Sequence, residues 1–243
     1  MSSLFIAGTD TSVGKTIVTR ALLQLLEQHK IPVAPYKPIA CGADDDTLIE
    51  PNSEKCICEN ICENNSDVLI LQSSCKRAFS YNEITSYSFK SFSMPIFAAL
   101  DKVSCIDITK LNKDLERLER IYTNVLVEGT HGWFTPINKD YNFADWVQST
   151  NMPVVLVVGI KEGCVNHTQL TVQAIRQNGV NIIGWVANRI NPGLRYYPEL
   201  VELLDQIIDA PLLGELPYIG RPEKQELFSY IQNPQPLLQY FTE

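Results

Sequence analysis

The chain has 243 residues, of which 45% are hydrophobic, and a formal net charge of −8 at pH 7. This size suits one large domain, and we expect a single domain over residues 1–243 because no linker rich in Pro, Gly or Ser divides the sequence. An acidic chain without a basic stripe disfavours nucleic-acid binding. The longest apolar run, Val154 to Ile160, is too short to span a bilayer, and no signal peptide is evident. We therefore expect a cytoplasmic protein.

Short apolar runs alternate with segments of helical periodicity along most of the chain. Strands buried on both faces read as near-continuous Val, Ile and Leu. Six strands of this kind are predicted at Leu4–Gly8, Val33–Lys37, Asn124–Glu128, Val154–Ile160, Ile182–Asn188 and Leu212–Leu216. Apolar residues recur on one face of three predicted helices: Ile17, Val18, Ala21, Leu22, Leu25 and Leu26; Leu111, Leu115, Leu118 and Ile121; Leu200, Val201, Leu204 and Ile208. The alternation predicts an α/β fold with a doubly wound, mostly parallel sheet flanked by helices, which binds ligands beyond the carboxyl ends of its strands.

The periodic pattern stops between residues 42 and 65, where we expect an exposed excursion within the domain. This segment contains Cys56, Cys58 and Cys62, whose spacing matches no common zinc-site pattern. An acidic surface insertion is therefore favoured over a metal site. The seven cysteines of the chain fit a reducing compartment as free thiols.

A phosphate-binding loop is predicted between the first strand and the first helix. The stretch GTDTSVGKT runs from Gly8 to Thr16, and its backbone N–H groups can converge on phosphate oxygens at the positive end of the helix. Lys15 is expected to reach the β- and γ-phosphates, and the Thr16 hydroxyl to bind Mg²⁺. Five residues rather than the usual four separate Gly8 from Gly14. The order of strand, loop and helix favours a nucleotide site over a chance match, but it leaves the reaction open.

Charged side chains are predicted at the ends of the next strands. Lys37 closes the second strand, where it could join Lys15 in stabilising charge on a transferring phosphoryl group. Glu128 closes the third strand and is better placed for a metal ion than for the core. Asp67 is a further candidate ligand of Mg²⁺, although Asp67 or Ser66 suits the N-cap of a helix equally well.

These stretches resemble the dethiobiotin synthetase family, a resemblance that extends from residue 4 to about residue 218. It is carried by GTDTSVGKT, YKPIACG, NSDVLILQ, VEGTHGWFTP, FADWV, PVVLVVGIKEGCVNHTQLT, GWVANRINP and PLLGELPY. The resemblance implies a homodimer with a P-loop-type fold, and an ATP-dependent ligase that converts 7,8-diaminopelargonate, CO₂ and ATP into dethiobiotin, ADP and phosphate. The carbamate made from one substrate amine attacks the γ-phosphate, and the second amine then closes the cyclic urea and expels phosphate.

The resemblance also implies roles for residues at matching positions. Lys15 and Lys37 are the catalytic residues, and the metal ligands are Thr16, Asp67 and Glu128. Nucleotide-binding positions are Ser12, Val13, Gly14, Lys15, Thr16, Ile17, Asp67, Glu128, Asn188 and Pro217. Substrate-binding positions are Thr11, Lys37, Cys41, His131 and Asn166. Asn188 matches an amide that recognises adenine. Asn166 matches a helix start that receives the distant carboxylate of the substrate from the partner subunit, which puts the substrate site at the subunit interface.

The sequence departs from the family pattern at several of these positions. Ser12 stands where glutamate is common, and Cys41 replaces a serine that commonly touches substrate. Thr130 and His131 replace a small Ala–Gly pair, so that His131 is expected to crowd its loop, since glycine tolerates positive φ far better. Two alternatives stay open. One is a related P-loop amidoligase or paralogue with an altered substrate, and the other is a regulatory or partitioning P-loop ATPase.

Overall fold

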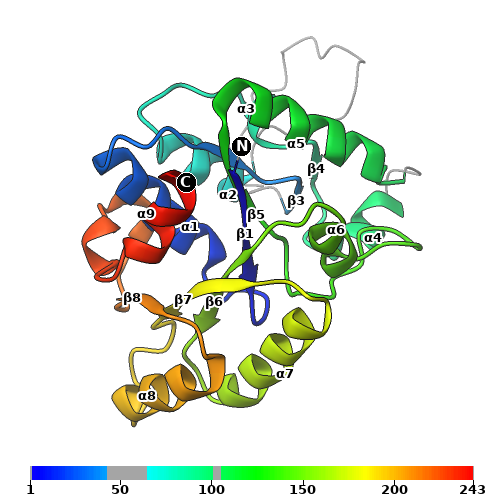
Figure 1. The fold of residues 1–243 in the computed structure, drawn as a ribbon. Coiled ribbons are helices and arrows are strands. Elements are labelled where there is room, and N and C mark those ends of the chain that lie inside the picture. Colours follow the sequence, from blue (N-terminus) through cyan, green and yellow to red (C-terminus); the bar gives the residue numbers. More distant parts are fainter. Residues whose placement is uncertain (1, 43–64, 101–104, 243) are drawn as a thin grey trace, which may run out of the picture.

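The computed structural model describes residues 2–42, 65–100 and 105–242 of the chain. Its centre is a six-stranded sheet in the order β2–β5–β1–β6–β7–β8, and every neighbouring pair is parallel (Figure 1). The strands are β1 (Ser2–Gly8), β2 (Ala34–Tyr36), β5 (Asn124–Glu128), β6 (Val154–Gly159), β7 (Ile182–Asn188) and β8 (Leu212–Leu216). All six predicted strands are confirmed, and their ends differ from the prediction by at most two residues.

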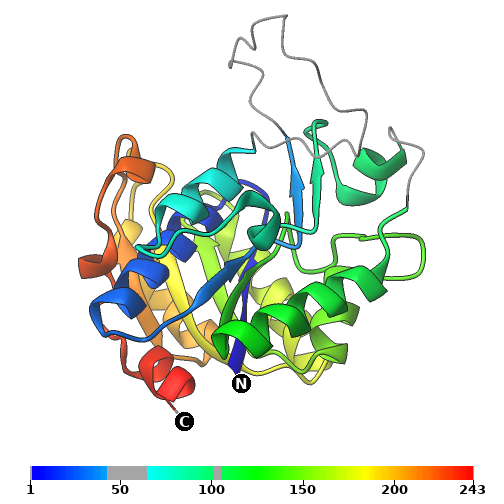
Figure 2. The same cartoon turned by 90° about the horizontal axis from the view of Figure 1, so that it is seen from above.

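Helices cover both faces of the sheet, so that the doubly wound arrangement is confirmed. On one face lie α1 (Lys15–Gln28) and α9 (Gln235–Thr242), and on the other lie α5 (Ile108–Tyr122), α6 (Phe143–Ser149) and α7 (Cys164–Gln177), as Figures 1 and 2 show. The remaining helices are α2 (Ser66–Ser73), α3 (Tyr81–Ile84), α4 (Pro95–Leu100), α8 (Tyr197–Ile208) and the 3₁₀ turns η1 (Pro222–Lys224) and η2 (Phe228–Tyr230). No helix in the described ranges has both the length and the apolar character needed to cross a membrane.

A second, two-stranded sheet stands beside the main one and was not predicted from the sequence. It pairs β3 (Ile39–Cys41) with β4 (Tyr87–Phe89) in parallel. Each strand has three residues, which is too short for a period of two to be recognised. This small sheet matters because it carries Cys41 to the same edge of the molecule as Lys37.

The predicted core faces of the helices are correct apart from one position. Leu111, Leu115 and Leu118 of α5 are buried, but Ile121 is 55% exposed. The apolar stripe of α5 continues at Tyr122, four residues after Leu118, and this tyrosine takes the core position predicted for Ile121. The predicted excursion over 42–65 lies outside the described residues apart from its two ends. The cysteines within the described ranges, at positions 41, 75, 105 and 164, are free thiols.

Candidate active site

The carboxyl ends of the parallel strands bring the predicted site residues to one edge of the sheet. The phosphate loop leaves β1, Lys37 follows β2 directly, Glu128 is the last residue of β5, and Asn188 is the last residue of β7. Because parallel strands all end on the same side, residues far apart in the sequence meet here. The candidate active site is therefore the region at the carboxyl ends of β1, β2, β5 and β7.

The phosphate loop turns into α1 at Gly14. This glycine is the N-cap of α1 and has φ of 87°, in the left-handed region that favours glycine. A Cβ atom at Gly14 would collide with the side-chain amide nitrogen of Asn188. Lys15 follows, with its side chain almost fully buried and its Nζ donating to the carbonyl oxygen of Asp10 at 3.1 Å. Burial, reinforced by repulsion from Lys37, lowers the pKa of Lys15 to about 8.

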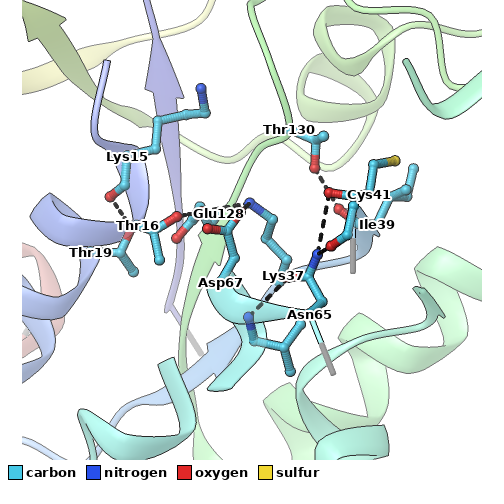
Figure 3. A network of polar contacts seen from close by, with 12 residues as sticks. Lys15, Thr16, Thr19, Lys37, Ile39, Cys41, Asn65, Asp67, Glu128 and Thr130 are labelled. Carbon is cyan, nitrogen blue, oxygen red and sulfur yellow. Dashed lines mark hydrogen bonds and ion pairs between the residues drawn. The ribbon is translucent and has the colours of Figure 1, made fainter. Parts of the chain in front are cut away.

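Lys37 lies at the centre of a network of charged and polar side chains (Figure 3). Its Nζ is 2.8 Å from Asp67 Oδ2 and 2.6 Å from Glu128 Oε1. The Thr16 hydroxyl donates to the same Glu128 oxygen at 2.7 Å. Lys37 is 2% exposed, so its ammonium points into the site and not into solvent. Burial alone would lower the pKa of Lys37, but the charges of Asp67 and Glu128 outweigh it and raise the pKa.

Glu128 also has an oxygen that lacks a partner. Its Oε2 is buried, and it accepts no hydrogen bond from the described residues. A buried carboxylate oxygen without a partner is costly, so this atom marks a place that a cation or a donor would fill. With Thr16 and Asp67, Glu128 provides the hydroxyl and carboxylate oxygens that Mg²⁺ prefers. No group of three or more His, Cys, Asp or Glu in the described ranges could hold a metal ion alone, so other ligands, such as nucleotide phosphates, would have to complete the coordination.

Asn65 caps the N-terminus of α2, which leaves the Asp67 side chain available for the network around Lys37. The N-cap of α2 is Asn65, whose side-chain oxygen accepts from the backbone N–H of Val68 at 3.3 Å. The alternative of Ser66 or Asp67 as the N-cap is thus wrong, because Asn65, the residue before Ser66, caps the helix. The Asn65 amide also donates to the carbonyl oxygens of Cys41 (3.2 Å) and Gly42. Asp67 therefore lies in the first turn of α2, and attraction to Lys37 overcomes the effect of burial and lowers its pKa.

Two adjoining cavities border the phosphate loop and share Gly14 and Ile17. The first, of about 240 Å³, is lined by Asn188 and Pro217, to which the resemblance assigns nucleotide binding, and also by Arg189 and Tyr218. The second, of about 280 Å³, is lined by the loop and by the lysine network. Its lining includes Thr11, Ser12, Lys15, Thr16, Lys37, Cys41, Asp67 and His131.

Val13 and Asn166 differ from the other predicted site residues in their placement. Val13 has a buried side chain and contributes its carbonyl oxygen, which accepts from Asn188 Nδ2 at 2.9 Å. Asn166 is exposed in the first turn of α7 and lines neither cavity. The N-cap of α7 is Gly163, so Asn166 is not the structural cap of this helix.

An ion pair that the sequence analysis missed ties the phosphate loop to α7. Lys161 Nζ lies 2.7 Å from Asp10 Oδ2, and His167 Nδ1 lies 3.7 Å from the same oxygen. The hydrogen bond that Lys161 donates to the Asp10 carboxylate lowers the pKa of Asp10. The signal was the position of Lys161 just after an apolar strand, which is the same signal that identified Lys37.

Comparisons with known proteins place the chain in a family. A family model described as an AAA domain matches residues 2–225. The chain is 62% identical to the ATP-dependent dethiobiotin synthetase BioD 1 of Haemophilus ducreyi, over 98% of this chain and 84% of that protein. It is 50% identical to BioD 1 of Pasteurella multocida, over 96% and 95% of the two chains.

Solved structures of lower identity share the fold. The cell division ATPase MinD of Pyrococcus furiosus has a TM-score of 0.58 at 16% identity, over 98% of this chain and 99% of that one. MinD of Pyrococcus horikoshii, complexed with Mg-ADP, has a TM-score of 0.55 at 16% identity, over 94% and 93%. These identities establish the P-loop fold alone, whereas the matches to curated relatives span nearly the whole chain at high identity. The chain belongs to the ATP-dependent dethiobiotin synthetase family.

Proposed function

We propose that this ligase makes dethiobiotin from 7,8-diaminopelargonate, CO₂ and ATP, with Lys15 and Lys37 as its catalytic cations and with Mg²⁺ held by Thr16, Asp67 and Glu128. The observation that carries the proposal is the buried contact of Lys37 with both carboxylates, next to the phosphate loop. A phosphoryl transfer between a carbamate and ATP brings several negative charges together. Buried, fixed cations are the groups that stabilise such charge most effectively.

The two lysines have different surroundings, which supports different roles. Lys15 belongs to the phosphate loop and has no carboxylate within ion-pair distance among the described residues, so its ammonium is available for the nucleotide phosphates. Lys37, in contrast, forms ion pairs with both Asp67 and Glu128. We infer that Lys37 serves the carbamate and the γ-phosphate, because it lines the cavity that also contains Thr11 and Cys41.

Glu128 and its neighbours support the assignment of a metal ion. The Thr16 hydroxyl donates to Glu128 Oε1, and the other oxygen of this carboxylate, Oε2, has no hydrogen-bond partner among the described residues. When bound, Mg²⁺ supplies charge neutralisation to the phosphates and carboxylates. The Pyrococcus horikoshii protein of the same fold binds Mg-ADP, which agrees with this proposal.

Asn188 supports recognition of adenine in the first cavity. Its Nδ2 donates one of its two hydrogens to the carbonyl oxygen of Val13, which orients the amide so that Oδ1 remains available as an acceptor for a ligand. An acceptor suits the exocyclic amino group of adenine and opposes the keto oxygen of guanine. We therefore infer that the enzyme prefers ATP to GTP.

The exposed Asn166 supports a substrate site shared between two subunits. This residue lies in the first turn of α7, where an anion is favoured, yet it lines neither cavity of its own chain. We infer that a cytoplasmic homodimer brings the α7 start of one subunit to the substrate bound by the other.

Two measurements test the proposal. The protein incubated with diaminopelargonate, bicarbonate and Mg·ATP should form dethiobiotin and ADP, and no product at high enzyme concentration would defeat the proposed substrates. Mixing two inactive variants, Lys37→Met and Asn166→Asp, should restore part of the activity, because one site of a mixed dimer keeps both residues. If the two variants are shown to exchange subunits and activity is still not recovered, this result argues against the shared site.

A further inference from the structure

Lys161 and Asp10 form an ion pair between the phosphate loop and the segment that leads into α7. Lys161 Nζ donates to Asp10 Oδ2 at 2.7 Å, and the backbone N–H of Thr11 donates to Asp10 Oδ1 at 2.7 Å. Both oxygens of the Asp10 carboxylate are therefore held, one by the loop itself and one by Lys161. Lys161 comes just after β6, which pairs in parallel with β1, the strand that leads into the loop. The ion pair thus fastens the phosphate loop to the neighbouring strand of the sheet.

The backbone of Asp10 holds the ammonium group of Lys15. Lys15 Nζ donates to the Asp10 carbonyl oxygen at 3.1 Å, and Lys15 lines the second cavity. A lysine side chain is long and flexible, so a fixed acceptor is needed to keep its ammonium in one place. Asp10 can be such an acceptor only while its own conformation is fixed, and the contacts of its carboxylate fix it.

The negative charge of Asp10 opposes the function of the phosphate loop. The loop is expected to bind anions through its N–H groups and the Lys15 ammonium, and a carboxylate within it repels them. Lys161 offsets this charge. The side chains of Lys161 and Asp10 are 33% and 38% exposed, and an ion pair as exposed as this adds little to the stability of a fold. Its main effect is therefore expected on a bound anion and not on folding.

We propose that Lys161 is a positioning residue for nucleotide binding, which offsets the charge of Asp10 and fixes the Asp10 carbonyl oxygen as the anchor of Lys15. This inference rests on the proposed function, because it takes Lys15 as the residue that binds the nucleotide phosphates. Lys161 itself lines neither of the two cavities, so it acts on the nucleotide through Asp10 and Lys15.

Calorimetric titration with Mg·ATP, without diaminopelargonate, tests the role of Lys161. Lys161→Met leaves Asp10 unopposed and should raise the Kd for ATP about tenfold or more, the scale of a lost charge-assisted hydrogen bond. Lys161→Arg keeps a charged donor, so its Kd should stay within about threefold of that of the unaltered protein. The matched control is Lys110→Met, which breaks another partly exposed Lys–Asp pair and should leave the Kd unchanged.

Two results of these titrations would overturn the inference. One is a Kd for Lys161→Met equal to that of Lys110→Met. The other is a Tm of Lys161→Met well below that of the control, since the lost affinity would then come from a disturbed fold.

A double-mutant cycle tests the link between Lys161 and Asp10. Asp10→Asn keeps an oxygen that can accept from the Thr11 N–H, and it removes the charge that Lys161 offsets. In this background Lys161→Met should change the Kd for ATP less than about twofold, because the two residues act as one unit. Effects that multiply fully would refute the role of Asp10. The titrations contain no diamine, so a chain that binds ATP as expected but makes no dethiobiotin would defeat the proposed reaction and not the role of Lys161.

Discussion

Replacement of Lys37 by methionine keeps the length of the side chain and removes its charge. Glu128 is fully buried and would lose its counter-ion, whereas Asp67 is partly exposed and would be compensated by water. Breaking a buried ion pair on one side costs about 3–5 kcal/mol of unfolding free energy. For a chain of this size, that corresponds to a fall in Tm of roughly 6–20 °C. Turnover should fall about 10²-fold or more, because a cation near the transferring phosphoryl group is lost.

The matched control for Lys37→Met is Lys110→Met. Lys110 contacts Asp114 at 2.9 Å, almost the distance of the Lys37–Asp67 pair, but its side chain is 46% exposed. A surface pair of this kind contributes about 0.3–0.5 kcal/mol. Differential scanning calorimetry without nucleotide, with and without Mg²⁺, should show a large loss of Tm for Lys37→Met alone, partly reversed by the metal. A Tm change no larger than the control's, together with turnover within tenfold of the unaltered protein, would refute the reasoning.

Three further predictions concern groups around Lys37. ATP affinity should be constant below pH 8 and fall up to tenfold per pH unit above it. The reason is that the pKa of Lys15 is lowered to about 8, so that above this pH the amine must regain its proton to bind phosphate. Calorimetric titrations that show no change in ATP affinity between pH 8 and 9.5 would contradict this. Glu128→Gln should raise the Mg²⁺ concentration for half-maximal activity roughly tenfold, since one charged ligand oxygen is lost, and an unchanged metal titration would argue against Glu128 as a ligand. Gly14→Ala should abolish nucleotide binding, because the added Cβ collides with the side chain of Asn188. Gly179→Ala should retain binding, since Gly179 also has a positive φ, of 68°, but no neighbour lies within 4 Å of the added Cβ. Equal losses of fluorescence-detected nucleotide binding in the two variants would show that contact with Asn188 is not the cause.

Most of the fold follows from the periodicity of the sequence. Strands such as Val154–Gly159 are buried on both faces and read as continuous apolar runs, so their number and limits were predictable. The error at Ile121 arose because spacings of three and four residues fit the same helical stripe, and only tertiary packing selects Tyr122. The short strands β3 and β4 pair with each other although they are far apart in the sequence, and three residues are too few for the sequence to reveal either strand.

The site was predictable where a residue type and its place after a strand were informative together. Lys37 and Glu128 satisfied both conditions, and the structure brings them into contact. The side-chain partners were not predictable, because they depend on orientation. The hydrogen bond of Asn188 to Val13 and the bridge from His131 to Thr11 join residues more than a hundred positions apart. The N-cap at Asn65 was missed because Asn, Ser and Asp are near-equal caps, and three adjacent candidates compete.

The two hydrogen bonds that the Asn65 side chain donates have a consequence for the evolution of this chain. They hold Asn65 against Cys41 and Gly42, so that the two ends of the described chain on either side of residues 43–64 lie together. The entropic cost of closing a loop grows only slowly with its length. Segments of very different length and composition can therefore be exchanged between these anchors during divergence, while the ion pair between Lys37 and Asp67 is kept.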